Sequence, residues 1–347
     1  MRVTWLALEW PRTGHHSGGV GRYAARLAGR TARLVDLTVV TYEGAKHIPG
    51  IHYVLLPAPN GRISRYYISA VRARAAVHST RPDVIHAHGD DFLLGGSVPI
   101  VRTFYGSSLS EARASRGLRR ANHYILGALE LWSARCASAR LGIAPETIDL
   151  FDCEELFPPF LGTTSVAPRQ PATSPTIVFI GSFCGRKQGW LAQQAVAHLR
   201  EHGHPDARLV VIGPQDDAAR WEPWVEHRSG LSDTQVSMLL STAWLLVSPS
   251  SYEGFGIPIV EALAHEVAVV ALRNPGSEYI HSQANGVAPL QLAMVDDFVV
   301  KVESRIRKGP LIDAAEIAGA QIVVTKLTYA GSPERLLSIY ENVLSTR

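Results

Sequence analysis

Two carboxylates frame a glycine turn in the second half of the chain, within SPSSYEGFGIPIVEALAHEVAVVA at residues 248–271. Residues 245–247 are expected to end a buried strand, and Pro258 is placed where a helix tolerates proline, in its first turn. Backbone N–H groups at such a strand-to-helix corner are free to face a phosphate or a sugar hydroxyl. We therefore predict an anion or sugar site at Gly254, Phe255 and Gly256.

The two carboxylates are Glu253, before the expected helix, and Glu261, on it. Side chains on a helix lean toward its N-terminus, so Glu261 is expected to reach back to the site that Glu253 enters from the loop. Carboxylates accept hydrogen bonds from sugar hydroxyls. For such a pair taken alone, the alternative is a surface role beside the helix dipole.

A basic turn follows the strand expected at 176–180 and reads Gly181-Ser182-Phe183-Cys184-Gly185-Arg186-Lys187. Cations in a turn of this kind are suited to clamp a leaving diphosphate, and Arg186 and Lys187 are the candidates. The alternative is that this basic pair is only a surface feature.

In the first half, candidate residues lie at three expected strands. Gly18 and Gly19 follow the first strand and open a helix, a pattern that is also typical of a plain loop. His86 and His88 lie two residues apart on the strand expected at 84–88, so their side chains point to the same face of the sheet. A third ligand at readable spacing is missing, so we predict no metal site there. Tyr105 follows the strand expected at 100–104.

The segment at 248–271 resembles glycosyltransferase family 4, whose signature is Glu-Gly-Phe-Gly, a proline, and a second Glu after seven intervening residues. The resemblance implies that Glu253 lies by the transferred sugar, that Glu261 holds the nucleotide ribose, and that the backbone between them contacts the donor. The matching residues are Glu253, Gly254, Phe255, Gly256, Pro258 and Glu261.

The resemblance covers nearly the whole chain, with two departures at functional positions. Where the family usually has Thr-x-His-Gly, Tyr105 stands in place of the histidine. Where the family has Gly-Arg followed by a lysine, the sequence keeps Lys187 but has Ser182, and Arg186 is the candidate substitute. The resemblance implies catalytic roles for Glu253, Lys187 and Arg186, donor contacts for Gly181 and Ser182, and a diphosphate and acceptor loop formed by Gly18, Gly19, His88 and Tyr105.

Apolar runs of strand length alternate with helical patterns along the chain, which is the signature of βαβ units in parallel sheets. The expected fold class is α/β, with two doubly wound Rossmann-like domains facing a central cleft, as in the GT-B type that the resemblance implies. We expect an N-terminal acceptor-binding domain at 1–160, a Pro/Ser/Thr-rich linker at 161–175, a C-terminal donor-binding domain at 176–330, and a helix at 331–347 that packs back on the N-terminal domain.

The expected elements come from these runs and their flanking turn residues. The last helix is expected to place Leu336, Leu337, Tyr340 and Leu344 on one face. Strands are expected at 3–8, 37–42, 52–56, 84–88, 100–104, 140–144, 176–180, 208–212, 243–247 and 267–272, and helices at 20–33, 64–79, 108–137, 188–201, 233–241, 257–264 and 334–344.

The 347 residues are 46% apolar and 19% charged, which fits a folded α/β protein and not a disordered or fibrous one. Cys136, Cys153 and Cys184 have no spacing that would hold zinc or build a disulfide framework, so a reducing, cytoplasmic location is expected. Residues 1–11 are expected to form a strand and not a signal peptide. No stretch reaches the roughly 18 apolar residues that a membrane-spanning helix needs.

Basic residues exceed acidic ones in the first 160 residues, although the net charge of the chain is only +3. The simplest account is a solvated helix face. The alternatives are peripheral contact with the anionic inner face of a membrane, or binding of a phosphorylated acceptor; nucleic acid is not an expected partner. The arginines gather in two segments, as Arg62, Arg65, Arg72 and Arg74, and as Arg113, Arg116, Arg119 and Arg120.

We expect a hexosyltransferase-like enzyme that moves a sugar from a nucleotide-diphosphate donor to the hydroxyl of a glycan, glycolipid or natural product, and the resemblance to family 4 implies that it is retaining. No cofactor and no metal are expected, because arginine, lysine and backbone amides can neutralise the diphosphate. The alternatives are a nucleotide-sugar epimerase or a phosphorylase on a similar fold, and a non-catalytic nucleotide-sugar binder. A nicotinamide dehydrogenase is excluded because neither domain's first strand is followed by the dinucleotide fingerprint.

Overall fold

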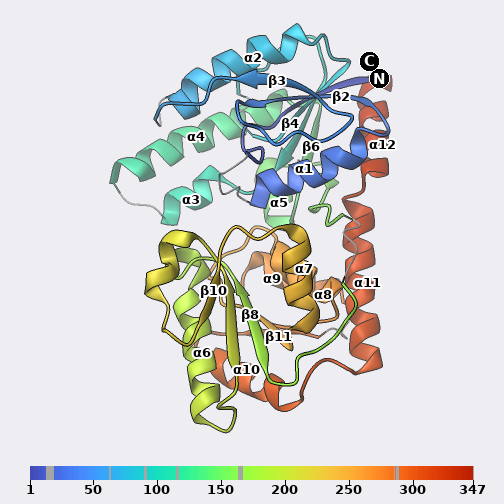
Figure 1. Cartoon of the computed structure of the whole chain (residues 1–347). Helices are drawn as coiled ribbons and strands as arrows, with labels where there is room; N and C mark the ends of the chain where they lie inside the picture. The colour runs from blue at the N-terminus through green and yellow to red at the C-terminus, as the bar shows by residue number, and fades with distance from the viewer. Residues whose placement is uncertain are drawn as a thin grey trace. The chain divides into compact units, whose positions relative to one another are not determined.

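The computed structural model describes residues 1–12, 19–61, 64–89, 92–114, 117–162, 167–284, 286 and 289–346. The chain divides into two compact units. Unit 1 comprises Met1–Phe160 and Thr328–Arg347, and unit 2 comprises Leu161–Leu327. Each unit holds one parallel sheet with helices packed around it (Figure 1).

Unit 1 contains a seven-stranded, all-parallel sheet in the order β3-β2-β1-β4-β5-β6-β7. The chain first builds outward from β1 to β3 and then returns to add β4 on the other side of β1, so the topological switch point lies between β1 and β4. The strands are β1 Arg2–Leu6, β2 Asp36–Tyr42, β3 His52–Leu56, β4 Val84–Ala87, β5 Ile100–Phe104, β6 Ala139–Gly142 and β7 Glu155–Leu156.

The helices of unit 1 connect successive strands, as right-handed crossovers in parallel sheets require. The last helix, α12, returns from the far end of the chain. Its Tyr340 hydroxyl accepts a hydrogen bond from Trp5 Nε1 over 3.0 Å and lies 2.6 Å from His86 Nδ1. The helices are α1 Gly19–Thr31, the π-helical η1 Ser64–Ile68, α2 Ser69–Ser79, α3 Ser108–Ala114, α4 Gly117–Cys136, α5 Pro145–Phe151 and α12 Pro333–Ser345.

The buried face of α12 differs in part from the expected one. Leu336 and Tyr340 are fully buried, but Leu344 is 36% exposed and Ile339 is buried in its place. The buried residues of α12 are Pro333, Leu336, Ile339 and Tyr340, so its burial ends before the last turn, on which Leu344 lies.

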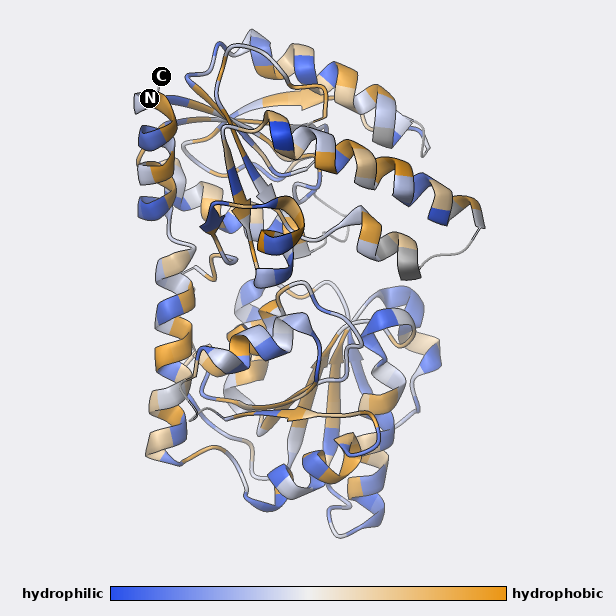
Figure 2. Cartoon of the chain, turned by 180° about the vertical axis from the view of Figure 1, so that it is seen from behind, coloured by the Kyte–Doolittle hydropathy of each residue, from blue (hydrophilic) through white to orange (hydrophobic). Residues whose placement is uncertain are grey.

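Unit 2 contains a six-stranded, all-parallel sheet in the order β10-β9-β8-β11-β12-β13. Its switch point lies between β8 and β11, which pair directly although more than 60 residues separate them. Strands β11 and β12 are buried along their whole length and consist of apolar residues apart from Ser248 at the end of β11 (Figure 2). The strands are β8 Thr176–Ile180, β9 Arg208–Ile212, β10 Glu226–Arg228, β11 Leu245–Ser248, β12 Ala268–Leu272 and β13 Leu290–Ala293.

The helices of unit 2 bury one face against this sheet, mainly through α6 and α10, whose apolar residues join one large core cluster. The last of them, α11, ends at Ala330, three residues inside the C-terminal part of unit 1. The helices are the 3-10 turn η2 Gly185–Lys187, α6 Gly189–Glu201, η3 Gln215–Arg220, α7 Asp233–Thr242, α8 Ile257–Ala264, α9 Pro275–Ser282, α10 Phe298–Arg307 and α11 Ala314–Ala330.

The segment expected as a linker, residues 161–175, is part of unit 2. The backbone N–H of Gln170 donates to the carbonyl of Ser241 over 3.0 Å, and that of Ala172 to the carbonyl of Thr242 over 3.0 Å. These bonds satisfy carbonyl groups at the C-terminal end of α7. Two doubly wound parallel sheets confirm the predicted fold class. Among the helices of the described residues, none is both long and apolar enough to cross a lipid bilayer.

Candidate functional site

The candidate site of unit 2 lies at the carboxyl end of its two central strands. The loop after β8 carries η2, and the loop after β11 runs through Ser250 to Gly256 before α8 begins. Because β8 and β11 flank the switch point, their loops diverge and leave the crevice in which doubly wound sheets bind ligands. The sequence-predicted donor residues come from these two loops.

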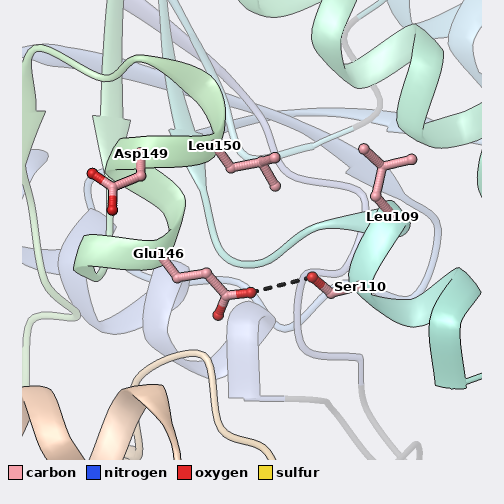
Figure 3. A pocket seen from close by; sticks show the side chains of 5 residues that line it. All are labelled: Leu109, Ser110, Glu146, Asp149 and Leu150. Atoms are coloured by element: carbon pink, nitrogen blue, oxygen red, sulfur yellow. Dashed lines mark hydrogen bonds between the residues drawn. The ribbon is translucent and has the colours of Figure 1, made fainter.

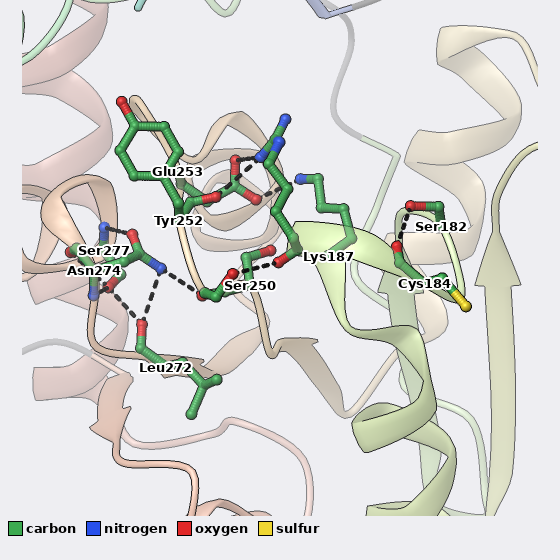
Figure 4. Close-up of polar contacts among 11 residues, drawn as sticks. Ser182, Cys184, Lys187, Ser250, Tyr252, Glu253, Leu272, Asn274 and Ser277 are labelled. Carbon is green, nitrogen blue, oxygen red and sulfur yellow. Dashed lines mark hydrogen bonds and ion pairs between the residues drawn. The ribbon is translucent and has the colours of Figure 1, made fainter. Parts of the chain in front are cut away.

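A buried carboxylate and two cations meet at this edge (Figure 4). Glu253 is only 6% exposed. Its Oε1 forms an ion pair with Lys187 Nζ, and its Oε2 lies 2.9 Å from Arg186 Nη1. The same Arg186 nitrogen also donates to the carbonyl of Tyr252 over 3.0 Å. The structure thus brings together the three residues for which a catalytic role is predicted.

The electrostatic balance at Glu253 favours the ionised acid. Burial alone would raise its pKa, but the charges of Lys187 and Arg186, with hydrogen bonds from Lys187 and Ser250, outweigh burial and hold the pKa below its ordinary value. A carboxylate that is anionic and nearly water-free at neutral pH can accept hydrogen bonds strongly from a ligand's hydroxyl groups.

Local backbone contacts fix the basic turn against the acidic loop. Ser251 N–H donates to the carbonyl of Arg186 over 2.8 Å, which ties η2 to the loop after β11. A Cβ on Gly181 would lie 3.0 Å from the Cβ of Lys187, so the absence of a side chain there allows Lys187 to lie over the end of β8. The loop therefore delivers the lysine to Glu253 through packing as well as charge.

A second set of contacts fixes the loop that carries Glu253. Asn274 Nδ2 donates to the carbonyl of Ser250 over 2.9 Å, and Gly276 N–H donates to the carbonyl of Glu253 over 3.1 Å. A Cβ on Gly276 would come within 2.6 Å of the carbonyl oxygen of Phe255. Asn274 was not predicted as a site residue; the available signal was its position directly before Pro275, where it caps α9.

The predicted glycine corner begins α8 as expected. Gly256 is the N-cap residue, with φ 97° and ψ 48°, and it has no side chain to satisfy the N–H groups of the first helical turn. Phe255 is buried and lies beside Tyr279, while Gly254 completes the turn. Glu261 is half-buried within α8, where its carbonyl accepts from the His265 side chain over 2.7 Å.

Ser182, which stands at the family's arginine position, makes a local turn. Its Oγ donates to the carbonyl of Cys184 over 3.0 Å, and its own carbonyl accepts from Gly189 N–H over 3.2 Å. The two cations of the turn are instead supplied by Arg186, whose side chain is 54% exposed, and Lys187, whose side chain is 19% exposed.

In unit 1, the structure places His88 and Tyr105 together at the carboxyl ends of β4 and β5. His88 Nδ1 lies 2.6 Å from the Tyr105 hydroxyl. Burial lowers the pKa of His88 to about 3, so the imidazole is neutral at physiological pH, and burial raises the pKa of Tyr105 well above its ordinary value. Among the described residues, His88 Nε2 is a buried atom without a hydrogen-bond partner.

His86 and His88 point to the same face of the sheet, with ring centroids 4.2 Å apart. Both nitrogens of His86 are engaged, Nδ1 with the Tyr340 hydroxyl at 2.6 Å and Nε2 with Thr103 Oγ1 at 2.8 Å. His86 therefore links β4, β5 and α12. Within the described ranges, no group of three or more His, Cys, Asp or Glu side chains is arranged to hold a metal ion.

The structure describes only one of the two glycines of the turn predicted in unit 1. Gly18 lies outside the described residues. Gly19 is the first residue of α1, and a Cβ there would meet no atom of the described residues within 4 Å.

Unit 1 also contains a hollow of about 290 Å³ between the start of α3 and α5 (Figure 3). Ser110 Oγ donates to Glu146 Oε1 over 3.2 Å across it. The walls combine two carboxylates and a hydroxyl with two leucine side chains; the lining residues are Leu109, Ser110, Glu146, Asp149 and Leu150. The sequence analysis named none of these five residues individually.

The site residues thus form two groups. Arg186, Lys187 and Glu253 converge in unit 2, with Gly181, Ser182 and the corner at 254–256 around them. His88 and Tyr105 converge in unit 1.

Both halves of the chain match glycosyltransferase family models. Residues 17–151 match the model described as Glycosyltransferase Family 4, and residues 174–307 match the one described as Glycosyl transferases group 1. The resemblance to family 4 is thereby confirmed, and the chain is a glycosyltransferase-family protein.

Two curated relatives match parts of the chain. An MMP alpha-(1->4)-mannosyltransferase of Mycolicibacterium hassiacum is 36% identical over 80 residues, which are 23% of this chain and 18% of that protein. Glycogen synthase of Mycobacterium tuberculosis is 29% identical over 220 residues, which are 54% of this chain and 51% of that protein. The chain therefore spans about half, or less, of the length of these relatives.

Several solved structures share the fold over the whole chain. WaaG, a glycosyltransferase involved in lipopolysaccharide biosynthesis, has a TM-score of 0.73 at 18% identity and covers 97% of this chain and 99% of its own. Sucrose-phosphate synthase from Thermosynechococcus elongatus has a TM-score of 0.77 at 16% identity, and Anabaena HepE with UDP-glucose has 0.72 at 13%, each covering 100% of both chains. These likenesses show that the fold is of the GT-B type.

Proposed function

We propose that this chain is a glycosyltransferase that moves a sugar from a nucleotide-diphosphate donor to an acceptor hydroxyl, with the donor in unit 2 and the acceptor in unit 1. The observation that carries the proposal is the buried Glu253 held by Lys187 and Arg186 at the switch-point edge of unit 2. The matches to a mannosyltransferase and a glycogen synthase support sugar transfer, and the neighbour that binds UDP-glucose supports a nucleotide-sugar donor.

In this proposal, the donor diphosphate competes with Glu253 for the two cations. Lys187 and Arg186 turn toward the phosphates, and the anionic Glu253 is then free to accept a hydrogen bond from a hydroxyl of the sugar. The first-turn N–H groups of α8 add donors that favour negative charge at the same edge. Glu261, on the same helix, is proposed to hold the ribose.

The proposed reaction is retaining and needs no metal. The bond between the anomeric carbon and the phosphate oxygen breaks on the face where the acceptor oxygen attacks, and the departing phosphate oxygen takes the acceptor's proton. Two cations and helix-terminal amides are sufficient in kind to stabilise the leaving diphosphate. The hollow beside α3 and α5 supports an acceptor that binds in unit 1. We also propose a cytoplasmic location, which is supported by the spacing of the three cysteines, since it is not that of a disulfide framework.

The first experiment identifies the donor by a thermal-shift screen against UDP-, GDP-, ADP- and dTDP-sugars, because a ligand of the native state raises Tm. Product analysis with an acceptor panel follows. Nucleotide release that depends on the acceptor supports transfer. Release that depends on phosphate, or on no acceptor, would indicate a phosphorylase or an epimerase. Donor binding without turnover would indicate a non-catalytic binder. This alternative is raised by Ser182 and Tyr105, which stand where the family pattern has an arginine and a histidine.

The second experiment assigns the residues. We expect Glu253→Gln and Lys187→Ala to lower turnover more than tenfold, a loss of about 1.4 kcal/mol or more of transition-state stabilisation. Glu253→Gln should keep or tighten binding of the nucleoside diphosphate, since its carboxylate no longer competes for the cations, whereas Lys187→Ala should weaken it. Lys301→Ala, which removes a surface ion pair to Asp297, is the control. Wild-type rates in both variants would remove these residues from the site.

A further inference from the structure

Helix α4 of unit 1 carries an apolar stripe that the fold leaves in solvent. Leu118 is 91% exposed, Ile125 54% and Trp132 52%, and Ala121 and Ala128 between them are exposed as well. The spacing of three and four residues places all five on one side of the helix. Apolar residues also recur along α4 in the hydropathy colouring (Figure 2).

The stripe is not the face that holds α4 in the fold. The buried residues His123, Leu126 and Ala134 lie on the opposite side of the helix at about 100° per residue. On that side α3 packs so closely that a Cβ on Gly127 would lie 2.4 Å from the side chain of Leu109. The helix thus has two apolar faces, of which the fold uses one.

The charges beside the stripe have one sign. Arg135 is exposed beside it, and Arg120 is exposed on the flank of the helix that carries Tyr124, where its guanidinium lies 5.7 Å from the centre of the Tyr124 ring. The one acidic residue in the sequence of α4, Glu130, is turned away and accepts hydrogen bonds from Ser108 N–H at 3.0 Å and Ser108 Oγ at 2.7 Å. Among the α4 side chains that the structure describes, the exposed ones are therefore apolar, aromatic or positively charged.

We propose that this face of α4 docks the protein on an anionic lipid surface. An amphipathic helix with aromatic residues, aliphatic residues and flanking arginines lies in the plane of the headgroups and buries its apolar side. Trp and Tyr are suited to that depth, since each has an apolar ring and a polar tip. A second copy of the chain fits this face less well, because two such faces would bring arginines together without an acid between them.

The arginines predicted from the sequence do not carry this proposal by themselves. Arg65 pairs with Glu9 at 3.2 Å, and Arg74 donates to the carbonyl of Leu93 over 2.9 Å. The side chains of Arg62, Arg113, Arg116 and Arg119 lie outside what the structure describes. The stripe of α4 is the added observation, because an apolar face beside exposed arginines distinguishes lipid docking from a merely solvated basic helix.

The test is flotation of the full chain with vesicles of phosphatidylcholine alone or with 30 mol% phosphatidylglycerol, and it requires no enzymatic activity. We expect binding only to the anionic vesicles, and a loss of at least tenfold in the partition coefficient for the Leu118→Glu/Ile125→Glu double variant. Arg120→Glu should lower it about fivefold or more. The controls are Val300→Glu on α10, where the valine is 62% exposed, and the exposed Arg33→Glu; neither should change binding.

Trp132 gives an independent readout. We expect its fluorescence, taken as the difference between the wild type and Trp132→Phe, to shift to the blue on anionic vesicles and to be quenched by brominated lipid. Equal binding of the wild type and the Leu118→Glu/Ile125→Glu variant would overturn the proposal. A concentration-dependent dimer in the absence of lipid that the same variant abolishes would also overturn it, in favour of an interface between copies.

Discussion

The ion pairs at Glu253 give the sharpest energetic prediction. Both cations contact the same carboxylate, whose side chain is 8% exposed, but Lys187 is 19% exposed and Arg186 is 54% exposed. Solvent screens the Arg186 contact and leaves the Lys187 contact strong. We therefore expect Lys187 to have a larger coupling free energy with Glu253 than Arg186 has, although both cations contact the same carboxylate.

The magnitudes follow from this difference in burial. Breaking a buried ion pair by removing one partner costs about 3–5 kcal/mol, whereas exposed pairs contribute about 0.2–1 kcal/mol. In double-mutant cycles built from Lys187→Met, Arg186→Met and Glu253→Gln, we expect a coupling energy of about 2–3 kcal/mol for the lysine pair and below about 1 kcal/mol for the arginine pair.

The assay is urea unfolding of each single and double variant, followed by tryptophan fluorescence without nucleotide. The matched control is the surface pair Lys301–Asp297, separated by 2.8 Å and with both side chains more than one third exposed, for which a much weaker coupling is expected because solvent screens it. A Lys187–Glu253 coupling no larger than that of this control would contradict the prediction, because burial would then add nothing to the pair.

Two further predictions concern pH and backbone packing. The pKa of His88 is about 3 in the fold against about 6.5 in the unfolded chain, so the unfolded state binds more protons in between, and the contribution of His88 to the free energy of unfolding should be complete well above pH 6.5 and fall by about 2 kcal/mol by pH 5. Burial also lowers the pKa of His86, which adds a loss of the same sign, so His88→Gln should reduce that slope in urea titrations without abolishing it, and an unchanged slope would count against this prediction. Gly276→Ala places a Cβ 2.6 Å from the carbonyl oxygen of Phe255 and 2.8 Å from that of Glu253, and we expect at least tenfold weaker donor binding by calorimetry. Gly95→Ala, whose Cβ would meet no atom of the described residues within 4 Å, should leave binding unchanged.

Buried parallel strands are the part of the fold that the sequence specifies most directly. Strands β5, β8 and β9 begin and end where predicted, because a strand covered on both faces appears as a short apolar run between turn residues. The edge strand β3 also has the predicted bounds, although most of its residues are exposed or half-buried. The edge strand β10 was not predicted, since its residues Glu226, His227 and Arg228 have no apolar pattern. The elements from α9 to α11 were not assigned, although Asn274-Pro275 is a helix-start signal.

The candidate site was predicted as residues but not as contacts. The family motif singled out Glu253 and Lys187, which the structure places in one ion pair. Their proximity depends on β8 lying beside β11, a pairing that no local pattern contains, since the intervening β9 and β10 go to the other side of β8. The pairing of His88 with Tyr105 likewise depends on β4 lying beside β5.

The two departures from the family pattern have structural counterparts at the same strand edges. Tyr105 replaces a histidine, but its hydroxyl lies 2.6 Å from the imidazole of His88, so a neutral imidazole and a polar group remain at the carboxyl end of β4 and β5. Ser182 replaces an arginine, but Arg186 reaches Glu253 from the same turn, so two cations still meet the acid. Because an anion site depends on the charges that converge on it and not on the position from which they come, the geometry favours an active enzyme over a binder that has lost its chemistry.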